Sequence, residues 1–283
     1  MGDNHQFRQV DVFGSGPLTG NPVAVVHDAD GLDDAQMQLF AQWTNLSETT
    51  FLLRPTQAEA DYRLRIFTPS RELPFAGHPT LGSAHAWLEA GGTPRGEAVV
   101  QECAAGLVTI TRGERLAFQA PPLVRSGPVS EEDLARIIRA LRIQRDQVVD
   151  AQWVDNGPGW VAVLLPDARD VLAVEADNAS FDGLEIGVVG PWTDGDPDGP
   201  GDADVEVRAL IPGDGIGEDP VTGSLNASLG QWLAGSVLPE QYVAAQGTVI
   251  GRRGRVHVRR EGTTVWVGGD TRTTVRGEVT LGG

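Results

Sequence analysis

The stretch RIFTPSRELPFAGHPTLGSAHAWL, residues 65–88, is repeated in altered form later in the chain as RALIPGDGIGEDPVTGSLNASLGQWL, residues 208–233. Both copies begin with an arginine and two apolar residues, pass through a polar turn containing glycine, and end in a helical pattern that closes on Trp-Leu. The opening arginines are 143 residues apart, whereas Gly82 and Gly223 are 141 apart, so the copies differ by two residues within the turn. A duplication of this period predicts two similar lobes rather than an array of short repeats.

Each half of the chain is rich in strand patterns around one prominent helix. In the first half, helical patterns cover 32–44 and 79–92, and strand patterns cover 7–13, 21–28, 48–53, 61–67, 97–103, 106–113 and 115–120. In the second half, helical patterns cover 130–141 and 222–235, and strand patterns cover 147–154, 159–166, 204–212, 242–250, 255–260, 263–270 and 277–281. Neither half alternates strand and helix regularly, which argues against a doubly wound parallel sheet.

The segment APPLVRSGPVS, residues 120–130, is the best candidate for a linker between the lobes, because it is rich in proline and polar residues. We therefore expect an N-terminal lobe over 1–120 and a C-terminal lobe over 121–283, and leave open a return of the C-terminal strand to the first lobe. We expect the active site in the cleft between them.

The charge of the chain restricts its partners. It carries 22 basic and 39 acidic residues, a net charge of -17, and such an acidic surface argues against nucleic acid or an anionic membrane as a partner. All the basic residues are arginines, and without lysine the chain cannot form a Schiff base, anchor pyridoxal phosphate or build a Walker A loop. A small molecule is the expected partner.

The compartment is expected to be the cytoplasm. Cys103 is the only cysteine, so no internal disulfide can form, and its apolar neighbours are typical of a buried strand residue. The N-terminal residues lack the pattern of a secretory signal, and no apolar run approaches the roughly 18 residues needed to span a bilayer.

The repeated turns predict a site for an anion. Gly77 and Ser83 in the first copy, and Gly223 and Ser224 in the second, lie at or near the start of a helix, where free N–H groups and the positive end of the dipole attract negative charge. For either copy alone, a turn and helix cap is the simpler interpretation. Two such turns that face one cleft favour binding of a carboxylate.

The charged residues beside these turns differ between the copies, with His78 before a proline in the first and Asp219 before a proline in the second. Glu48, in the segment NLSETTFLL, opens an apolar strand. Taken singly, Asp219 can be explained as a helix cap, His78 as a turn histidine and Glu48 as a solvated residue at the edge of a sheet. Together they suggest a poorly hydrated glutamate that can both take and return a proton, with His78, Asp219 and Ser224 orienting the substrate.

Metal and dinucleotide sites are not expected. The five histidines do not pair at chelating spacing with carboxylates. The glycine-rich segment PGDGIGED lacks the dinucleotide spacing, and its two adjacent carboxylates would repel a pyrophosphate. The segment G-x-S-x-G of serine hydrolases is absent from the sequence.

The motifs VDVFGSGPLTGNPVAVV, LSETTFLL, FTPSRELPFAGHPTLGSAHAWL, GEDPVTGSLNASLGQWL and QGTVIGRRGRVHV resemble the PhzF-like phenazine biosynthesis proteins, in order and over nearly the whole chain. The resemblance implies an α+β fold of the diaminopimelate epimerase type, with two pseudo-symmetric lobes, each a barrel-like and mostly antiparallel sheet around a central helix. It also implies a homodimer. One departure is GRRGRV, which stands where a Gly-Arg-Pro turn is common in the family.

The resemblance implies an isomerase without cofactor, in which a glutamate removes a proton from trans-2,3-dihydro-3-hydroxyanthranilate and returns it to another ring carbon. By motif that glutamate is Glu48, the histidine of GHP is His78, the aspartate of EDP is Asp219 and the serine of TGS is Ser224. These residues recur in family members with other substrates, so they indicate proton transfer and leave the metabolite open.

Two alternatives remain open at the level of sequence. The first is an amino-acid racemase or epimerase on the same fold, although the two-cysteine type is disfavoured because Cys103 lies outside both turns. The second is a non-catalytic protein that binds a metabolite in the cleft. The role of the acidic loop 193–203 and the surface of the dimer are also left open.

Overall fold

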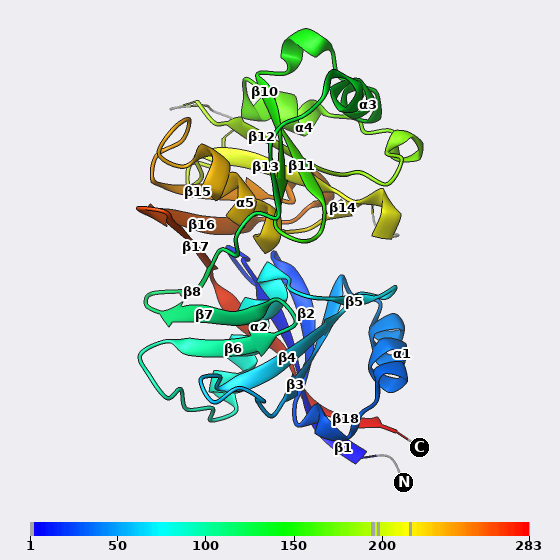
Figure 1. The fold of residues 1–283 in the computed structure, drawn as a ribbon, viewed down its shortest axis with the longest axis vertical. Helices are drawn as coiled ribbons and strands as arrows, with labels where there is room; N and C mark the ends of the chain where they lie inside the picture. Colours follow the sequence, from blue (N-terminus) through cyan, green and yellow to red (C-terminus); the bar gives the residue numbers. More distant parts are fainter. Residues whose placement is uncertain (1–2, 194–195, 197–198, 215–216, 283) are drawn as a thin grey trace. The chain divides into compact units, whose positions relative to one another are not determined.

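The computed structural model describes residues 3–193, 196, 199–214 and 217–282 (Figure 1). The chain divides into two compact units, one formed by the residues up to Gln119 together with those from Gly268 onward, the other by Ala120–Val267. The last strand belongs to unit 1, which is the return to the first lobe that the sequence analysis left open. The predicted acidic loop 193–203 lies partly outside the described residues.

Unit 1 is built on a mixed, mostly antiparallel sheet. Its strands, in order of pairing, are β18 (Thr271–Leu281), β1 (Asp3–Val12), β2 (Asn21–Val26), β3 (Glu48–Leu53), β4 (Tyr62–Phe67), β6 (Val99–Cys103), β7 (Gly106–Arg112) and β8 (Leu116–Gln119). The short β5 (Glu72–Leu73) pairs with β4. Only the pairs β2–β3 and β4–β6 are parallel among these. The helices are α1 (Asp34–Thr44) and α2 (Gly77–Glu89).

Unit 2 repeats this order of pairing with its own strands. They are β9 (Arg125–Pro128), β10 (Asp150–Asp155), β11 (Trp160–Leu164), β12 (Glu185–Pro191), β13 (Val205–Leu210), β15 (Gln241–Gln246) and β16 (Gly254–Glu261), with the short β14 (Glu218–Asp219) on β13. Here the parallel pairs are β11–β12 and β13–β15. The helices are α3 (Glu131–Leu141), α4 (Ala168–Ala173) and α5 (Gly223–Leu233). Strand β17 (Thr264–Gly269) spans the limit between the units.

The structure differs from the sequence analysis at the strand that comes first in the pairing order of each unit. In unit 2 that strand is β9, which pairs with β10 and lies inside the predicted linker. In unit 1 the same position is taken by β18, which pairs with β1 from Asp3–Leu281 to Val12–Thr271. Strand β12 and helix α4 were also missed. Each of these elements gains its stability from pairing or packing partners far away in sequence, so its local pattern is weak.

Each unit has one buried helix that is packed against its sheet. In α2 the residues from Gly77 to Ala84 are all buried, and the helix contacts β1, β2, β3 and β18. Small residues allow this close approach: a Cβ on Gly82 would lie 2.4 Å from Val23 Cγ1. In α5, a Cβ on Gly230 would lie 2.7 Å from Val258 Cγ1. The predicted α+β class, with two similar lobes built around central helices, is confirmed.

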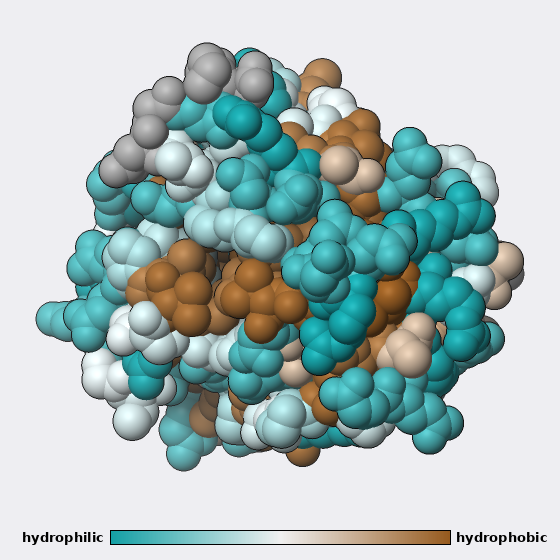
Figure 2. Space-filling view, turned by 90° about the horizontal axis from the view of Figure 1, so that it is seen from above, coloured by the Kyte–Doolittle hydropathy of each residue, from teal (hydrophilic) through white to brown (hydrophobic). Residues whose placement is uncertain are grey.

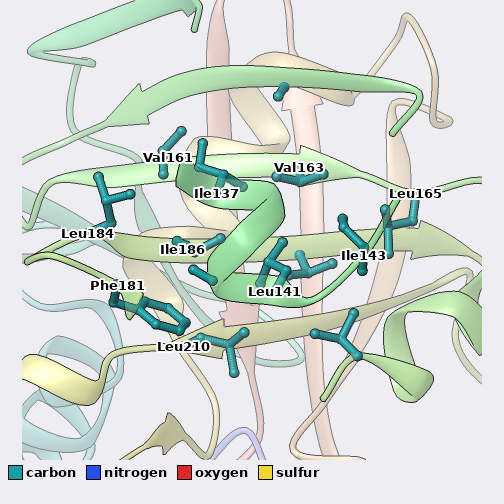
Figure 3. Packing of buried hydrophobic residues seen from close by; sticks show 14 of the residues in the cluster. Ile137, Leu141, Ile143, Val161, Val163, Leu165, Phe181, Leu184, Ile186 and Leu210 are labelled. Atoms are coloured by element: carbon teal, nitrogen blue, oxygen red, sulfur yellow. The ribbon is translucent and has the colours of Figure 1, made fainter. Parts of the chain in front are cut away.

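The amphipathic helix α3 covers a second core in unit 2. Ser130 caps it by accepting a hydrogen bond from the backbone N–H of Asp133, and acidic residues occupy its first turn. Ile137 and Leu141 point from α3 toward Val163 and Ile186 of the sheet (Figure 3). Figure 2 shows a face of the molecule on which hydrophilic residues predominate and hydrophobic ones gather in a few places, as the acidic composition implies. No helix among the described residues is long and apolar enough to cross a bilayer.

Candidate active site

Glu48 is fixed at the start of β3 by the end of α1. Helix α1 ends at Asn45, which adopts the left-handed conformation (φ 51°) and donates its backbone N–H to the carbonyl of Ala41. The chain then turns into β3, where Glu48 is opposite Val23 of β2. The side chain of Glu48 is 14% exposed, so it is largely withdrawn from water yet still reachable.

His78 lies beside Glu48. Its Nε2 is 3.3 Å from Glu48 Oε2, and its side chain is only 3% exposed. Burial lowers the pKa of His78 to about 3, against a smaller opposing effect from a hydrogen bond with the Pro22 backbone. The imidazole is therefore neutral at physiological pH, and the contact with Glu48 is a polar contact rather than an ion pair.

Asn21 is a neighbour of this pair that the sequence analysis missed. Its Nδ2 is 3.3 Å from His78 Nδ1, and it is fully buried at the start of β2. The turn before it is held by Asp11, whose carboxylate accepts the backbone N–H groups of Thr19 and Gly20. An asparagine at the end of a glycine-rich turn, in LTGNPVAVV, was the available signal.

The start of α2 has the open backbone that the sequence analysis predicted. Gly77 is its first residue and Ala76 its N-cap, so among the described residues no side chain caps this end. Ser83 does not belong to this end. It is fully buried in the second turn, and its hydroxyl is 2.9 Å from that of Thr50 on β3, so its role in substrate binding stays a prediction.

The start of α5 is arranged in the same way. Gly223 is its first residue, and the N-cap is Thr222, whose side chain makes no capping hydrogen bond. The Thr222 hydroxyl instead donates to Asp219 Oδ2 at 2.5 Å. Asp219 is on β14 and is 6% exposed.

Ser224, the second residue of α5, is held by two residues that the sequence analysis missed. Its Oγ accepts a hydrogen bond from the indole Nε1 of Trp160 at 3.1 Å, and its carbonyl accepts one from Asn156 Nδ2 at 2.9 Å. Asn156 lies in the glycine-rich turn between β10 and β11, and Asn21 directly follows the turn between β1 and β2 as the first residue of β2. Each unit thus places a buried asparagine from an equivalent turn near the start of its central helix.

The arginine that opens each copy of the repeat has a structural role. Arg65 forms a bidentate pair with Glu72, at 2.7 and 2.6 Å. Arg208 pairs in the same way with Glu218 and also donates to the carbonyl of Val174. Both glutamates are on the short strand that precedes the central helix, so the pair anchors the turn that presents His78 or Asp219.

The predicted site residues therefore form two groups, each within one unit. Unit 1 brings together Glu48, His78 and Gly77, and unit 2 brings together Asp219, Ser224 and Gly223. Among the described residues, no three His, Cys, Asp or Glu side chains gather as a metal ion would require.

Nearly the whole chain matches known proteins in sequence. Residues 10–281 match the family model of the phenazine biosynthesis-like proteins. The chain is 37% identical to antisense-enhancing sequence 1 of Schizosaccharomyces pombe, over 97% of this chain and 98% of that protein. It is 33% identical to the trans-2,3-dihydro-3-hydroxyanthranilate isomerase of Pseudomonas chlororaphis, over 98% of this chain and all of that enzyme.

Among solved structures, a phenazine biosynthesis protein of the PhzF family from Enterococcus faecalis superimposes with a TM-score of 0.79 at 25% identity, covering 99% of this chain and 100% of that one. The match extends over both units, as the duplication requires. The chain belongs to the phenazine biosynthesis-like protein family, and the isomerase class that its sequence predicted is confirmed.

Proposed function

We propose that this protein is a cofactor-independent isomerase that moves a proton on a small amino- or carboxylate-bearing metabolite, with Glu48 as general acid and base. The observation that carries the proposal is the contact between the Glu48 carboxyl and the neutral, buried imidazole of His78, at 3.3 Å, beside the uncapped start of α2. A carboxyl group with little water around it, beside a neutral imidazole, is suited to taking a proton from carbon and returning it.

The proposed reaction begins when a Glu48 oxygen removes a proton from a substrate carbon. The electron pair of the broken C–H bond moves into the conjugated system of the substrate, and the negative charge is taken up by its polar groups. The same carboxyl then returns the proton to a different carbon, so atoms and charge balance without an oxidant or reductant. His78 remains neutral and supports Glu48 through Nε2.

The groups in unit 2 are proposed to bind the polar part of the substrate. Asp219 accepts from an amino or hydroxyl group, and the open N–H groups at Gly223 and Ser224 bind a carboxylate. Gly77 has the same role at α2. The support is the repeated turn, which supplies an uncapped helix start in each unit.

The first substrate to test is trans-2,3-dihydro-3-hydroxyanthranilate, because the relative from Pseudomonas chlororaphis is named for it. In heavy water, the wild type should return product with deuterium at the carbon that receives the proton. Glu48→Gln should incorporate no deuterium while it still binds the compound in calorimetry. Glu89→Gln, at the far end of α2, is the matched control and should keep exchange activity.

Other outcomes distinguish the alternatives. Deuterium at a stereocentre without movement of a double bond would indicate an epimerase that still uses Glu48. Exchange retained in Glu48→Gln would remove Glu48 from the role of acid and base. Binding without turnover across a panel of amino acids and hydroxyanthranilates would favour a binding protein.

We also propose a homodimer, on the strength of the family resemblance, and a cytoplasmic location, on the strength of the single cysteine. Light scattering should then give about twice the chain mass of 30.1 kDa. A mass equal to one chain at micromolar concentration would contradict the dimer.

A further inference from the structure

Gln246 is a fully buried amide at the end of β15, outside the residues that the proposed mechanism uses. It is 0% exposed, and the next residue, Gly247, has a left-handed backbone (φ 87°) that turns the chain away. A Cβ on Gly247 would lie 2.5 Å from the carbonyl oxygen of Pro220, so this turn packs closely against the segment that carries Asp219.

The amide of Gln246 makes hydrogen bonds through all of its donor and acceptor positions. Its Oε1 accepts from the backbone N–H of Thr222 at 3.0 Å and from Asn226 Nδ2 at 2.9 Å. Its Nε2 donates to the carbonyl of Asp219 at 3.2 Å and to Thr222 Oγ1 at 2.9 Å. An amide has two donor hydrogens and two acceptor lone pairs, so each is used and the orientation of the group is fixed.

These contacts determine the direction of the Thr222 hydroxyl. Because its oxygen accepts from Gln246, its hydrogen is available to donate, and it points to Asp219 Oδ2 at 2.5 Å. A chain of hydrogen bonds therefore runs from Gln246 through Thr222 to the Asp219 carboxylate. The same amide holds the Asp219 backbone and the N-cap of α5, so two parts of the proposed substrate site in unit 2 depend on it.

We propose that Gln246 is a positioning residue that sets the orientation of the Asp219 carboxylate through Thr222 and aligns it with the open start of α5. The inference rests on the proposed function, in which Asp219 and the α5 start bind the substrate. Gln246 touches no substrate atom in this assignment.

Unit 1 also has a buried glutamine bonded to its central helix, but at another position of the corresponding strand. Gln101, at 0% exposure on β6, donates to Thr80 Oγ1 on α2 at 3.0 Å and accepts from the Tyr62 hydroxyl at 3.1 Å. Both units thus tie the central helix to the neighbouring strand with a buried glutamine. In unit 2 the hydrogen bonds of the glutamine continue through Thr222 to the Asp219 carboxylate.

The test compares Gln246→Met, Thr222→Val and the double variant, assayed for kcat and KM with trans-2,3-dihydro-3-hydroxyanthranilate. Gln246→Met fills the same space without hydrogen bonds, and Thr222→Val removes the hydroxyl. We expect each single variant to lower kcat/KM by about 10- to 100-fold, because small misplacement of a binding group is costly. The kcat/KM of the double variant should be no lower than that of the less active single variant, because both changes break the same chain of hydrogen bonds. Thr222→Ser, which keeps the hydroxyl, should restore the activity.

A stability control separates positioning from general loosening. Leu233→Ala opens a cavity at the far end of α5, where Leu233 is 0% exposed, and should lower the melting temperature as much as Gln246→Met does while keeping kcat/KM near wild type. An equal loss of kcat/KM in Leu233→Ala, or additive losses in the double variant, would overturn the proposal.

Failure of the proposed function gives a different result. If Asp219→Asn keeps wild-type kcat/KM, the role of Asp219 fails; if Asp219→Asn is impaired and Gln246→Met is not, only the positioning role fails. Should the wild type not turn over this compound, the crystal structure of Gln246→Met decides instead. The proposal expects the Thr222 hydroxyl and the Asp219 carboxylate to separate, and an unchanged contact between them would refute it.

Discussion

At the scale of single residues, two of the buried titratable groups have opposite effects on the pH dependence of stability. His78 in unit 1 and Glu206 in unit 2 each have a pKa displaced toward the neutral form by burial. Neutral forms are favoured because a buried charge loses hydration that its surroundings do not replace. His78 takes part in the proposed chemistry. Glu206 is fully buried on β13 and has no role in that chemistry, and its burial lowers the stability of the folded state.

His78 should stay neutral throughout the physiological range. Because burial lowers its pKa to about 3, the unfolded chain takes up a proton near pH 6.5 that the folded protein does not. The stability associated with neutral His78 is present above pH 6.5 and is lost as the pH falls toward 3. Nuclear magnetic resonance of the ring carbons, assigned with a His78→Gln variant, should show no titration of this residue above pH 5. A midpoint near 6.5 would contradict the neutral imidazole.

Glu206 should make the folded state less stable at higher pH. Burial raises its pKa to about 7, against smaller opposing effects from the Thr248 hydroxyl, Arg255 and the Trp192 indole. The folded protein then binds the proton more tightly than the unfolded chain does, so this contribution is complete below about pH 4.5 and is lost as the pH rises through 7. The total loss is roughly 3–4 kcal/mol by the linkage relation.

The variant Glu206→Gln removes this titration. Its melting temperature should exceed that of the wild type at pH 8 and match it at pH 5, in thermal scans of both proteins in the same buffers. If the melting temperatures of the two proteins change in parallel between pH 5 and pH 8, Glu206 does not ionise in this range.

At the scale of elements, the packing of α2 against the sheet depends on the absence of a side chain at Gly82. A Cβ there would lie 2.4 Å from Val23 Cγ1 and 3.1 Å from Val12 Cγ2, so the helix or β2 would have to move. The same helix presents His78 to Glu48, which means that the close approach serves both packing and the site.

The variant Gly82→Ala should therefore destabilise the protein by about 1–3 kcal/mol, the range found for overpacked cores. Urea unfolding measures this, with Gly96→Ala as control because a Cβ there meets nothing within 4 Å. Adding Val23→Ala should recover part of the loss by making room for the new methyl group. A double variant less stable than the sum of the single ones would argue against the steric explanation.

At the scale of the whole molecule, unit 1 depends on the last strand of the chain. β18 pairs with β1 along its length, and Arg276 of β18 contacts Glu89 of α2 at 2.6 Å. Unit 2, from Ala120 to Val267, does not contain this strand. The C-terminal residues should thus matter for one unit and not for the other.

Truncation after Asp270 tests this dependence. The shortened chain leaves β1 without its partner, so limited proteolysis followed by mass spectrometry should cut within 3–119 before it cuts within 120–267. A chain truncated after Leu281 keeps β18 and should resist cleavage as the wild type does. Equal cleavage of both units in the Asp270 truncation would contradict the assignment of β18 to unit 1.

The duplicated architecture, the family, and the candidates Glu48, His78, Asp219 and Ser224 can be predicted from the sequence, because each lies within a local motif whose residue types and spacing carry the information. The side chains that support them are known only from the folded chain. Asn21 is 57 positions from His78, and Trp160 is 64 from Ser224, so no local pattern could relate them.

The same reason applies to two further contacts. Ser83 follows a glycine near a helix start, and only in the folded chain does the hydroxyl of Thr50, 33 positions earlier, lie against it. The sequence left open whether the last strand returns to the first lobe, and the pairing of β18 with β1 assigns it there. The local sequence pattern predicts which helices and strands form. Burial and hydrogen bonding between residues distant in sequence decide which strands pair and which side chains meet.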